Sequence, residues 1–285
     1  MKHLIVFLLL MHFAVFQIAG ANEVGTEEQV FRVVCVKKTA DLSKVLAGEN
    51  TQYIIRYNHD LSRYKDGVVI GKNSILEFRK GSLNNGKIVF NDTHIKSKVS
   101  RIFSNNVYDG LINVPEAYPE WFGAEGNGLT DDTRAIQDAL NVSNTVSGIS
   151  GKVYAVRTAS PFNHCLEIKR DSLTMNINLK DINEYSTSDY RGRGVIFLDN
   201  KSAFSFSGSI TTVNVKLPVS AETGLSLENS RAGIVCYGDS SGLDINLTCS
   251  NLYCGVTNGA FMYDEYLYRN GTEGINHSKI KVIAY

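Results

Sequence analysis

The feature that most constrains the fold is a set of three segments in which apolar and polar residues alternate strictly. These segments run from Leu173 to Lys180, from Phe204 to Ile210 and from Leu243 to Thr248. A period of two indicates strands with one buried and one solvated face. No tight two-residue turn separates the three segments, which argues against the antiparallel hairpins of a β-sandwich, the alternative fold for such a pattern.

The same segments belong to a longer repeat. Gly194–Leu198 precedes the second alternating segment, and Gly233–Tyr237 precedes the third at the same offset. A further short piece begins at Gly255, 22 residues after Gly233, and Leu217–Arg231 is expected to be an insertion. Unequal coils stacked about 4.8 Å apart account for this pattern, since no coil of a solenoid buries its apolar face alone.

The run from Phe122 to Leu140 predicts a glycine turn followed by a short amphipathic helix. Three glycines fall within six residues, at Gly123, Gly126 and Gly128. Thr130 is the expected N-cap, and Asp131 and Asp132 are expected in the first helical turn, where the helix dipole favours negative charge. The apolar face consists of Ala135, Ile136, Ala139 and Leu140.

This run resembles the N-terminal signature of the pectate lyase superfamily, in its pectin lyase-like and rhamnogalacturonase/epimerase-like form. The family pattern F-G-A-x-G-D-G-x-T-D-D-T-x-A-I-Q-x-A is matched at Phe122, Gly123, Ala124, Gly126, Gly128, Thr130, Asp131, Asp132, Thr133, Ala135, Ile136, Gln137 and Ala139. The chain departs from it at Asn127, which keeps an acceptor oxygen for a local turn but loses the charge of the family's Asp. The resemblance implies an all-β, right-handed parallel β-helix with a short capping α-helix; it identifies a fold and no particular reaction.

The N-terminal part is expected to be a small β-rich module over residues 22–114, which either caps the solenoid or begins it. Strands are predicted at 30–36 and 53–57, a short helix at 39–47, and then short strands separated by turns from Gly67 to Phe103. Asn85-Gly86 taken alone has the composition of a hairpin turn. The expected joint is 115–119, residues 142–150 are expected to be a loop, and residues 115–285 are assigned to the β-helix domain.

Residues 1–21 have the features of a secretory signal peptide. Lys2 and His3 precede an apolar core from Leu4 to Ile18, and Ala19-Gly20-Ala21 is a small-x-small cleavage pattern, so the mature chain is expected to begin near Asn22. The apolar stretch is short for a membrane span, and no transmembrane segment is expected in the mature chain. The protein is therefore expected to be secreted or periplasmic.

Composition narrows the possible partners. The chain has 29 basic and 29 acidic residues and no basic run, which argues against nucleic acid as a partner. Its five cysteines cannot all pair with one another, and Cys249 and Cys254 are expected either to pair or to be buried as small apolar side chains. No spacing predicts a zinc site or another metal or cofactor site, and calcium is expected only if the chain is a lyase.

No catalytic residues can be assigned from the sequence. Asp199 and Asp239 fall at nearly corresponding places, but the strand offset puts Asn200 opposite Asp239, and both aspartates lie in turn sequences. The resemblance implies either clustered carboxylates, for a hydrolase, or a basic residue, for a lyase. Other residues considered are the bases Lys169, Arg170, Arg269 and Lys279, the possible sugar-stacking residues Tyr263, Tyr266 and Tyr268 with Asp264, and the isolated His164 and His277.

Two hypotheses about function follow from the resemblance. The first is an exported enzyme, a polysaccharide lyase or glycoside hydrolase of acidic polysaccharides. The second is a non-catalytic glycan-binding or surface-interaction solenoid, or a shortened member of the family without the active-site coils. The chain stops on a predicted strand, Ile280–Tyr285, so pairing with a second copy through an open solenoid end is a further expectation.

Overall fold

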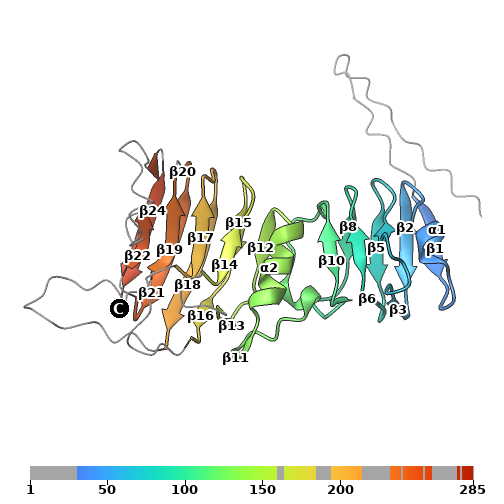
Figure 1. The fold of residues 1–285 in the computed structure, drawn as a ribbon, viewed down its shortest axis with the longest axis horizontal. Helices are drawn as coiled ribbons and strands as arrows, with labels where there is room; N and C mark the ends of the chain where they lie inside the picture. Colours follow the sequence, from blue (N-terminus) through green and yellow to red (C-terminus); the bar gives the residue numbers. More distant parts are fainter. Residues whose placement is uncertain are drawn as a thin grey trace, which may run out of the picture. The chain divides into compact units, whose positions relative to one another are not determined.

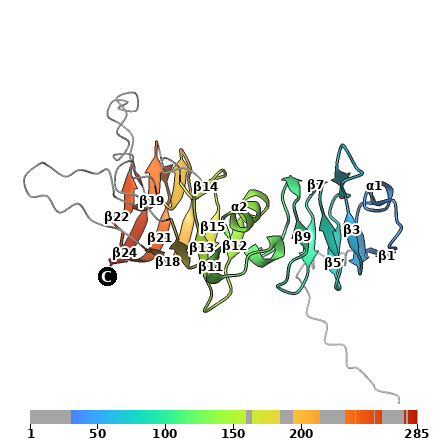
Figure 2. The same ribbon diagram turned by 60° about the horizontal axis from the view of Figure 1, so that its bottom comes forward.

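The structure is a computed structural model. It describes residues 31–158, 164–183, 194–213, 232–238, 240–252, 254–258, 275–276 and 278–284. These residues are mostly β-strand, with two α-helices and one 3-10 helix among them. Figures 1 and 2 show that strands close in sequence also lie close in space, from β1 to β24. The predicted all-β class is confirmed for the described residues.

The N-terminal strands repeat in groups of three, which we call rungs. From β2 onward each rung contributes one strand to each of three sheets, ordered β1-β2-β5-β8, β3-β6-β9 and β4-β7-β10, and β1 precedes the first complete rung. All pairs in these sheets are parallel. The elements of this part are β1 (Arg32–Val36), α1 (Leu42–Val45), β2 (Thr51–Ile55), β3 (Asn58–Asp60), β4 (Val68–Val69), β5 (Ile75–Phe78), β6 (Ser82–Asn84), β7 (Lys87–Val89), β8 (His94–Lys96), β9 (Phe103–Ser104) and β10 (Val107–Asp109).

The C-terminal strands also pair in parallel from one rung to the next. An eight-stranded sheet has the order β11-β13-β16-β18-β15-β12, with β21 paired to β18 and β24 paired to β21, and a second sheet has the order β14-β17-β19-β22. The elements of this part are η1 (Pro119–Phe122), β11 (Asn127–Asp131), α2 (Thr133–Val142), β12 (Thr145–Ser147), β13 (Val153–Val156), β14 (Leu166–Ile168), β15 (Thr174–Asn176), β16 (Leu179–Asp181), β17 (Ile196–Asp199), β18 (Ser205–Thr212), β19 (Ala232–Tyr237), β20 (Ser240–Ser241), β21 (Asp244–Ser250), β22 (Cys254–Asn258), β23 (Ile275–Asn276) and β24 (Lys279–Ala284).

The predicted strand from Leu173 to Lys180 is in fact two strands, β15 and β16. The first part of β18 pairs with β15 and its last part pairs with β16, so the large sheet bends within β18. The bend lies at Gly208, where an added Cβ would be 1.9 Å from the Ile177 carbonyl oxygen. Alternation continues through this corner, because Ile177 and Leu179 are both buried, and the period of two therefore did not reveal it.

Helix α2 lies between strands instead of closing the end of a stack. It contacts β10 on one side and β14 on the other, and Figures 1 and 2 show it within the succession of strands. Ile136 and Leu140 are buried, as predicted. The expected capping helix therefore does not close an end of the stack, because strands lie on both sides of it.

Side chains make up for the backbone hydrogen bonds that a helix cannot offer to a neighbouring strand. The Gln137 amide nitrogen donates to the Glu167 carbonyl oxygen (3.0 Å), and the Glu167 N–H donates to Gln137 Oε1 (2.9 Å), so one side chain satisfies both backbone groups of a β14 residue. The Arg170 guanidinium donates to the carbonyl oxygens of Leu140, Asn141 and Ser143 at the end of α2. Arg170 therefore satisfies helix-end acceptors that would otherwise lack partners.

The predicted capping of α2 is wrong in part. Thr130 lies in β11, and the N-cap residue is Asp132, whose side chain makes no capping hydrogen bond. The buried Asp132 carboxylate instead accepts from the N–H groups of Glu125 (2.8 Å) and Gly126 (3.0 Å). Asp131 Oδ1 accepts from the Thr133 N–H (3.0 Å), but neither aspartate lies in the first turn of the helix, where both were expected. Burial raises the pKa of Asp132, and the two N–H groups oppose that effect.

The local turn role expected of Asn127 is confirmed. Its Oδ1 accepts from the N–H groups of Leu129 and Thr130, both at 2.8 Å. Its amide nitrogen donates to Glu125 Oε2 (2.8 Å) and to Thr130 Oγ1 (3.0 Å). An amide therefore serves here as both acceptor and donor, which a carboxylate cannot do.

Hydrogen bonds continue across the expected joint at 115–119. The Ile102 N–H donates to the Trp121 carbonyl oxygen (3.0 Å), and the Ile112 N–H donates to the Val142 carbonyl oxygen (2.8 Å). An isolated parallel bridge pairs Ala117 with Val146. The residues around the joint are thus hydrogen-bonded to elements both before and after it.

Two smaller predictions also need correction. Residues 142–150, expected to be a loop, contain β12. Asn85-Gly86 makes no hairpin, because β6 and β7 on either side of it pair with other strands. Asn85 instead takes a positive φ of 58° at a corner of its rung.

Cys165, Cys236 and Cys249 are buried, as the small-apolar interpretation predicted, whereas Cys35 is exposed. The side chain of Cys254 lies outside the described residues, and so do the signal peptide, the Leu217–Arg231 insertion, Tyr263, Asp264, Tyr266, Tyr268, Arg269 and His277.

Replacing Gly208 by Ala is expected to destabilise the protein by about 3 kcal/mol, because the new methyl group would overlap a backbone oxygen that has no freedom to move. The matched control is Gly151→Ala, at a position with positive φ (81°) but nothing within 4 Å of the added carbon. That variant should lose only about 1 kcal/mol. Equal losses of unfolding free energy in urea titrations would contradict the close approach at Gly208.

Candidate functional site

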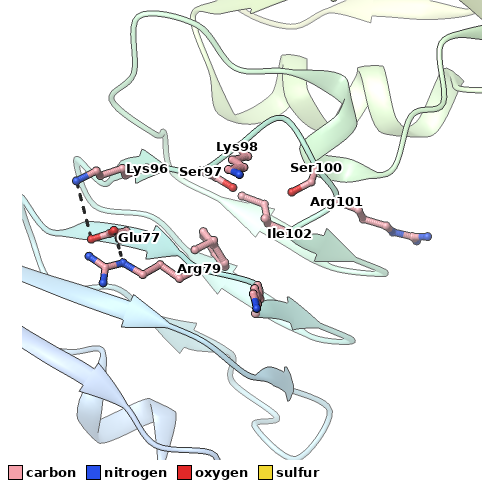
Figure 3. Close-up of a pocket in the computed structure, with 11 residues that line it drawn as sticks. Glu77, Arg79, Lys96, Ser97, Lys98, Ser100, Arg101 and Ile102 are labelled. Carbon is pink, nitrogen blue, oxygen red and sulfur yellow. Dashed lines mark hydrogen bonds and ion pairs between the residues drawn. The ribbon is translucent and has the colours of Figure 1, made fainter.

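A groove of about 620 Å³ lies at the corner that follows β5 and β8. Its walls are the segments 77–81 and 96–102, which come from two successive rungs. Figure 3 shows these side chains together, with Glu77, Arg79 and Lys96 in one group and Arg101 at the other end. We call it the basic groove; its charged lining residues are Glu77, Arg79, Lys80, Lys96, Lys98 and Arg101.

Glu77 organises one side of the basic groove. Its Oε1 accepts from Arg79 Nε, its Oε2 accepts from Gln52 Nε2, and Lys96 Nζ lies 4.0 Å from Oε2. The hydrogen bond from Arg79 lowers the pKa of Glu77, and Glu77 in turn raises the pKa of Arg79. Glu77 is buried, whereas the side chains of Arg79 and Lys96 are 49% and 68% exposed, so the cations cover the carboxylate and still face solvent.

The other side of the groove is held by η1. Trp121 Nε1 donates to the Lys98 carbonyl oxygen (3.2 Å), which fixes the loop that carries Lys98. Arg101 donates to Ser104 Oγ (2.7 Å) and passes close to Gly123, where an added Cβ would lie 3.0 Å from Arg101 Nε. A glycine of the sequence motif therefore leaves room for a cation of the groove.

The groove is suited to an anionic ligand. Its lining carries five basic side chains and one carboxylate, although the whole chain has no net charge. Since Glu77 is already bound by Arg79 and Gln52, the positive charge is left in excess. A concave surface of one sign concentrates ligands of the opposite sign.

Residues singled out from the sequence lie around a second cavity, of about 620 Å³, between α2 and β14. Lys169 lies 3.7 Å from Glu167, and the His164 ring stacks on Phe197 with the ring centroids 4.7 Å apart. Burial raises the pKa of Asp138 in this cavity to about 6, against the opposing effect of Arg134. The cavity borders residues 159–163, which lie outside the described part, and its acidic and basic side chains are mixed.

Arg170, Lys279 and Asp199, the other candidates in the described part of the chain, line neither cavity. Arg170 is bound to the end of α2, and Lys279 is exposed on β24. Asp199 pairs with Tyr237, so β17 and β19 are offset by one residue less than predicted. Asp239 itself lies outside the described residues.

Sequence reasoning missed the basic groove, although one signal was present. Glu77 pairs with Lys96 at the ends of β5 and β8, so the basic residues that follow these two strands belong to neighbouring rungs. The two short basic segments, Arg79-Lys80 and Lys96–Arg101, are separate in the sequence and neither is unusual alone. Only the register shows that they lie side by side.

Within the described residues, no group of three or more His, Cys, Asp or Glu side chains could hold a metal ion. In the same part of the chain, no helix is long and apolar enough to cross a bilayer. Comparison of the chain with protein-family models, curated proteins and solved structures gives no match.

Replacing Glu77 by Gln is expected to lower the melting temperature by about 2–4 °C at neutral pH, the effect of roughly one lost interaction in a chain of this size. The lowered pKa means that the folded state favours the ionised carboxylate. This stabilisation is therefore complete above the ordinary pKa of 4.5 and is lost as pH falls through the folded-state pKa.

Thermal unfolding of both proteins from neutral to acid pH measures this effect. The difference in melting temperature should shrink below pH 4.5. Glu49→Gln, at an exposed glutamate, is the control and should change little. A difference that stays constant down to the acid limit would contradict the role of ionised Glu77.

Proposed function

We propose that this chain is an exported right-handed parallel β-helix protein of the pectate lyase superfamily type, and that its basic groove binds acidic polysaccharides. Residues 1–21 serve as the export signal in this proposal, and the mature chain is secreted or periplasmic. The observation that carries the binding function is the concentration of five basic side chains around one groove.

The fold supports the first part of the proposal. Strands pair in parallel from rung to rung, with buried residues in register, as in the column Tyr53, Leu76 and Ile95. Parallel strands that follow one another at short spacing require the chain to complete a circuit between them. A β-helix satisfies this requirement, and the match of Phe122–Ala139 to the family signature supports the same fold.

The chemistry of the groove supports the second part. Carboxylate or sulfate groups along a polysaccharide repeat at regular intervals, and the groove offers cations from two stacked rungs. Arginine and lysine each supply several hydrogen-bond donors to the anionic oxygens of the polysaccharide. The serines at 97 and 100 also line the groove and are placed to hydrogen-bond its sugar hydroxyl groups. An extended acidic polymer that crosses the rungs meets cations from both.

We assign binding and not hydrolysis to this groove. Hydrolysis of a glycosidic bond commonly uses two carboxyl groups that face each other across the bond. Of the described residues that line the groove, Glu77 is the carboxylate, and Arg79 and Gln52 occupy its two oxygens. Its ionised state, held by Arg79, is also the wrong state for a general acid.

The test is retention by polygalacturonate in affinity electrophoresis, compared with a neutral dextran. Changing Lys98 and Arg101 together to Glu should weaken retention about tenfold or more, since two attractive charges become repulsive. The matched control changes Lys37 and Lys38 to Glu, an equal change of charge at exposed positions after β1. The control should retain most of the binding.

Two results would contradict the proposal. Either wild-type protein that polygalacturonate does not retain, or equal weakening by both double variants, would show that the basic groove is no specific site. The same samples, followed by ultraviolet absorbance for unsaturated uronides and by reducing ends, test whether binding is accompanied by lyase or hydrolase activity.

A further inference from the structure

Lys80 has the most unusual backbone of any described non-glycine residue. Its φ is 102°, whereas the other non-glycine residues with positive φ lie between 48° and 58°. That narrow range is the left-handed helical region, which Asn, Asp and, at some cost, other residues adopt. Lys80 lies outside it, in a region that glycine adopts readily and other residues rarely do, so its backbone is strained.

The neighbouring backbone explains how this conformation is maintained. The Arg79 N–H donates to the Ile55 carbonyl oxygen (2.8 Å), and the Ser82 N–H donates to the Tyr57 carbonyl oxygen (3.3 Å). At Gly81 the chain comes so close to the previous rung that an added Cβ would lie 2.5 Å from the Tyr57 oxygen. Hydrogen bonds on both sides therefore leave Lys80 and Gly81 to make the corner.

Nothing in the corner geometry calls for a lysine. At most of the other positive-φ positions without glycine the chain uses asparagine, as at Asn50, Asn73, Asn85 and Asn105, and glycine would make the Lys80 corner without strain. The backbone at Lys80 is thus less stable than the same corner with glycine. Lys80 thus carries a long cationic side chain at a position where the backbone conformation disfavours any side chain. The same residue lines the basic groove.

We infer that Lys80 is the specificity-determining residue of the basic groove and binds an anionic group, carboxylate or sulfate, of an acidic polysaccharide. This inference rests on the proposed function. It adds the residue that contacts the ligand, and it gives a reason why a lysine stands at a strained backbone position. Arg79 is engaged by Glu77 and Arg101 by Ser104, whereas Lys80 is exposed at the corner between them in the chain. Its three N–H donors are therefore placed to meet the ligand.

Two variants separate the charge of Lys80 from its strain. Lys80→Gln keeps a side chain in the strained conformation but removes the charge, so retention on polygalacturonate should weaken about fivefold with no gain in melting temperature. Lys80→Gly removes both, so it should weaken retention equally and raise the melting temperature by about 2 °C. Lys80→Arg should restore retention, and Lys72→Ala, which removes an exposed lysine before β5, should leave it unchanged.

Dextran sulfate in a parallel experiment distinguishes a sulfate from a carboxylate as the preferred group. Retention of Lys80→Gln equal to wild type on both polymers would overturn the inference while leaving the proposed function intact. Lys80→Gly with an unchanged or lower melting temperature would overturn it as well, because the corner would then not be strained. Wild-type protein retained by neither polymer would overturn the proposed function, and this inference with it.

Discussion

Parallel stacking in register is the constraint on which the rest of this structure depends. A single rung exposes both edges of every strand, so it acquires its backbone hydrogen bonds from the rungs before and after it. The register then places side chains in columns: Tyr53, Leu76 and Ile95 form a buried column, and Ile54, Glu77 and Lys96 form a column on the opposite face. A slip of one residue would exchange the two faces. The same constraint that builds the core therefore also brings Glu77 beneath Lys96 and creates one side of the basic groove.

The strands could be predicted from the sequence, and most of the corners could not. Alternation locates the buried faces because burial requires it, as at Phe206 and Ile245. The residue at a corner is determined instead by the backbone conformation or by the space available. Asn73 has a positive φ, and Gly208 lies beside the Ile177 carbonyl oxygen. Alternation can continue through a corner without a break. The pattern from Leu173 to Lys180 therefore predicts one strand, although the segment forms two strands on either side of a bend.

Corners also explain why the candidate site escaped prediction. Ile196 pairs with Ile234, whereas Ser205 pairs with Asp244, so the offset between the same two rungs changes by one residue as the chain passes a corner. A single repeat length therefore misplaces residues such as Asp199. The cations of the basic groove come from two rungs, and their proximity depends on the local offset between β5 and β8. The composition of the chain did not indicate a basic site, because the excess positive charge of the groove is balanced elsewhere in a chain of zero net charge.

The residues that support α2 and the residues that line the basic groove are separate for a physical reason. Helix α2 occupies a place between strands, and a helix has no backbone groups to offer a strand edge. Gln137 of α2 hydrogen-bonds the backbone of β14, and Arg170, which follows β14, hydrogen-bonds the carbonyl oxygens at the end of α2. Asp132 accepts hydrogen bonds from the backbone of the glycine turn. These side chains are committed to the stack and cannot change without loss of stability. Lys80, Lys98 and Arg101 lie at corners on the outer surface, where the stack needs only a backbone conformation. The side chains at these corners can therefore change with less effect on the stack than the side chains that support α2.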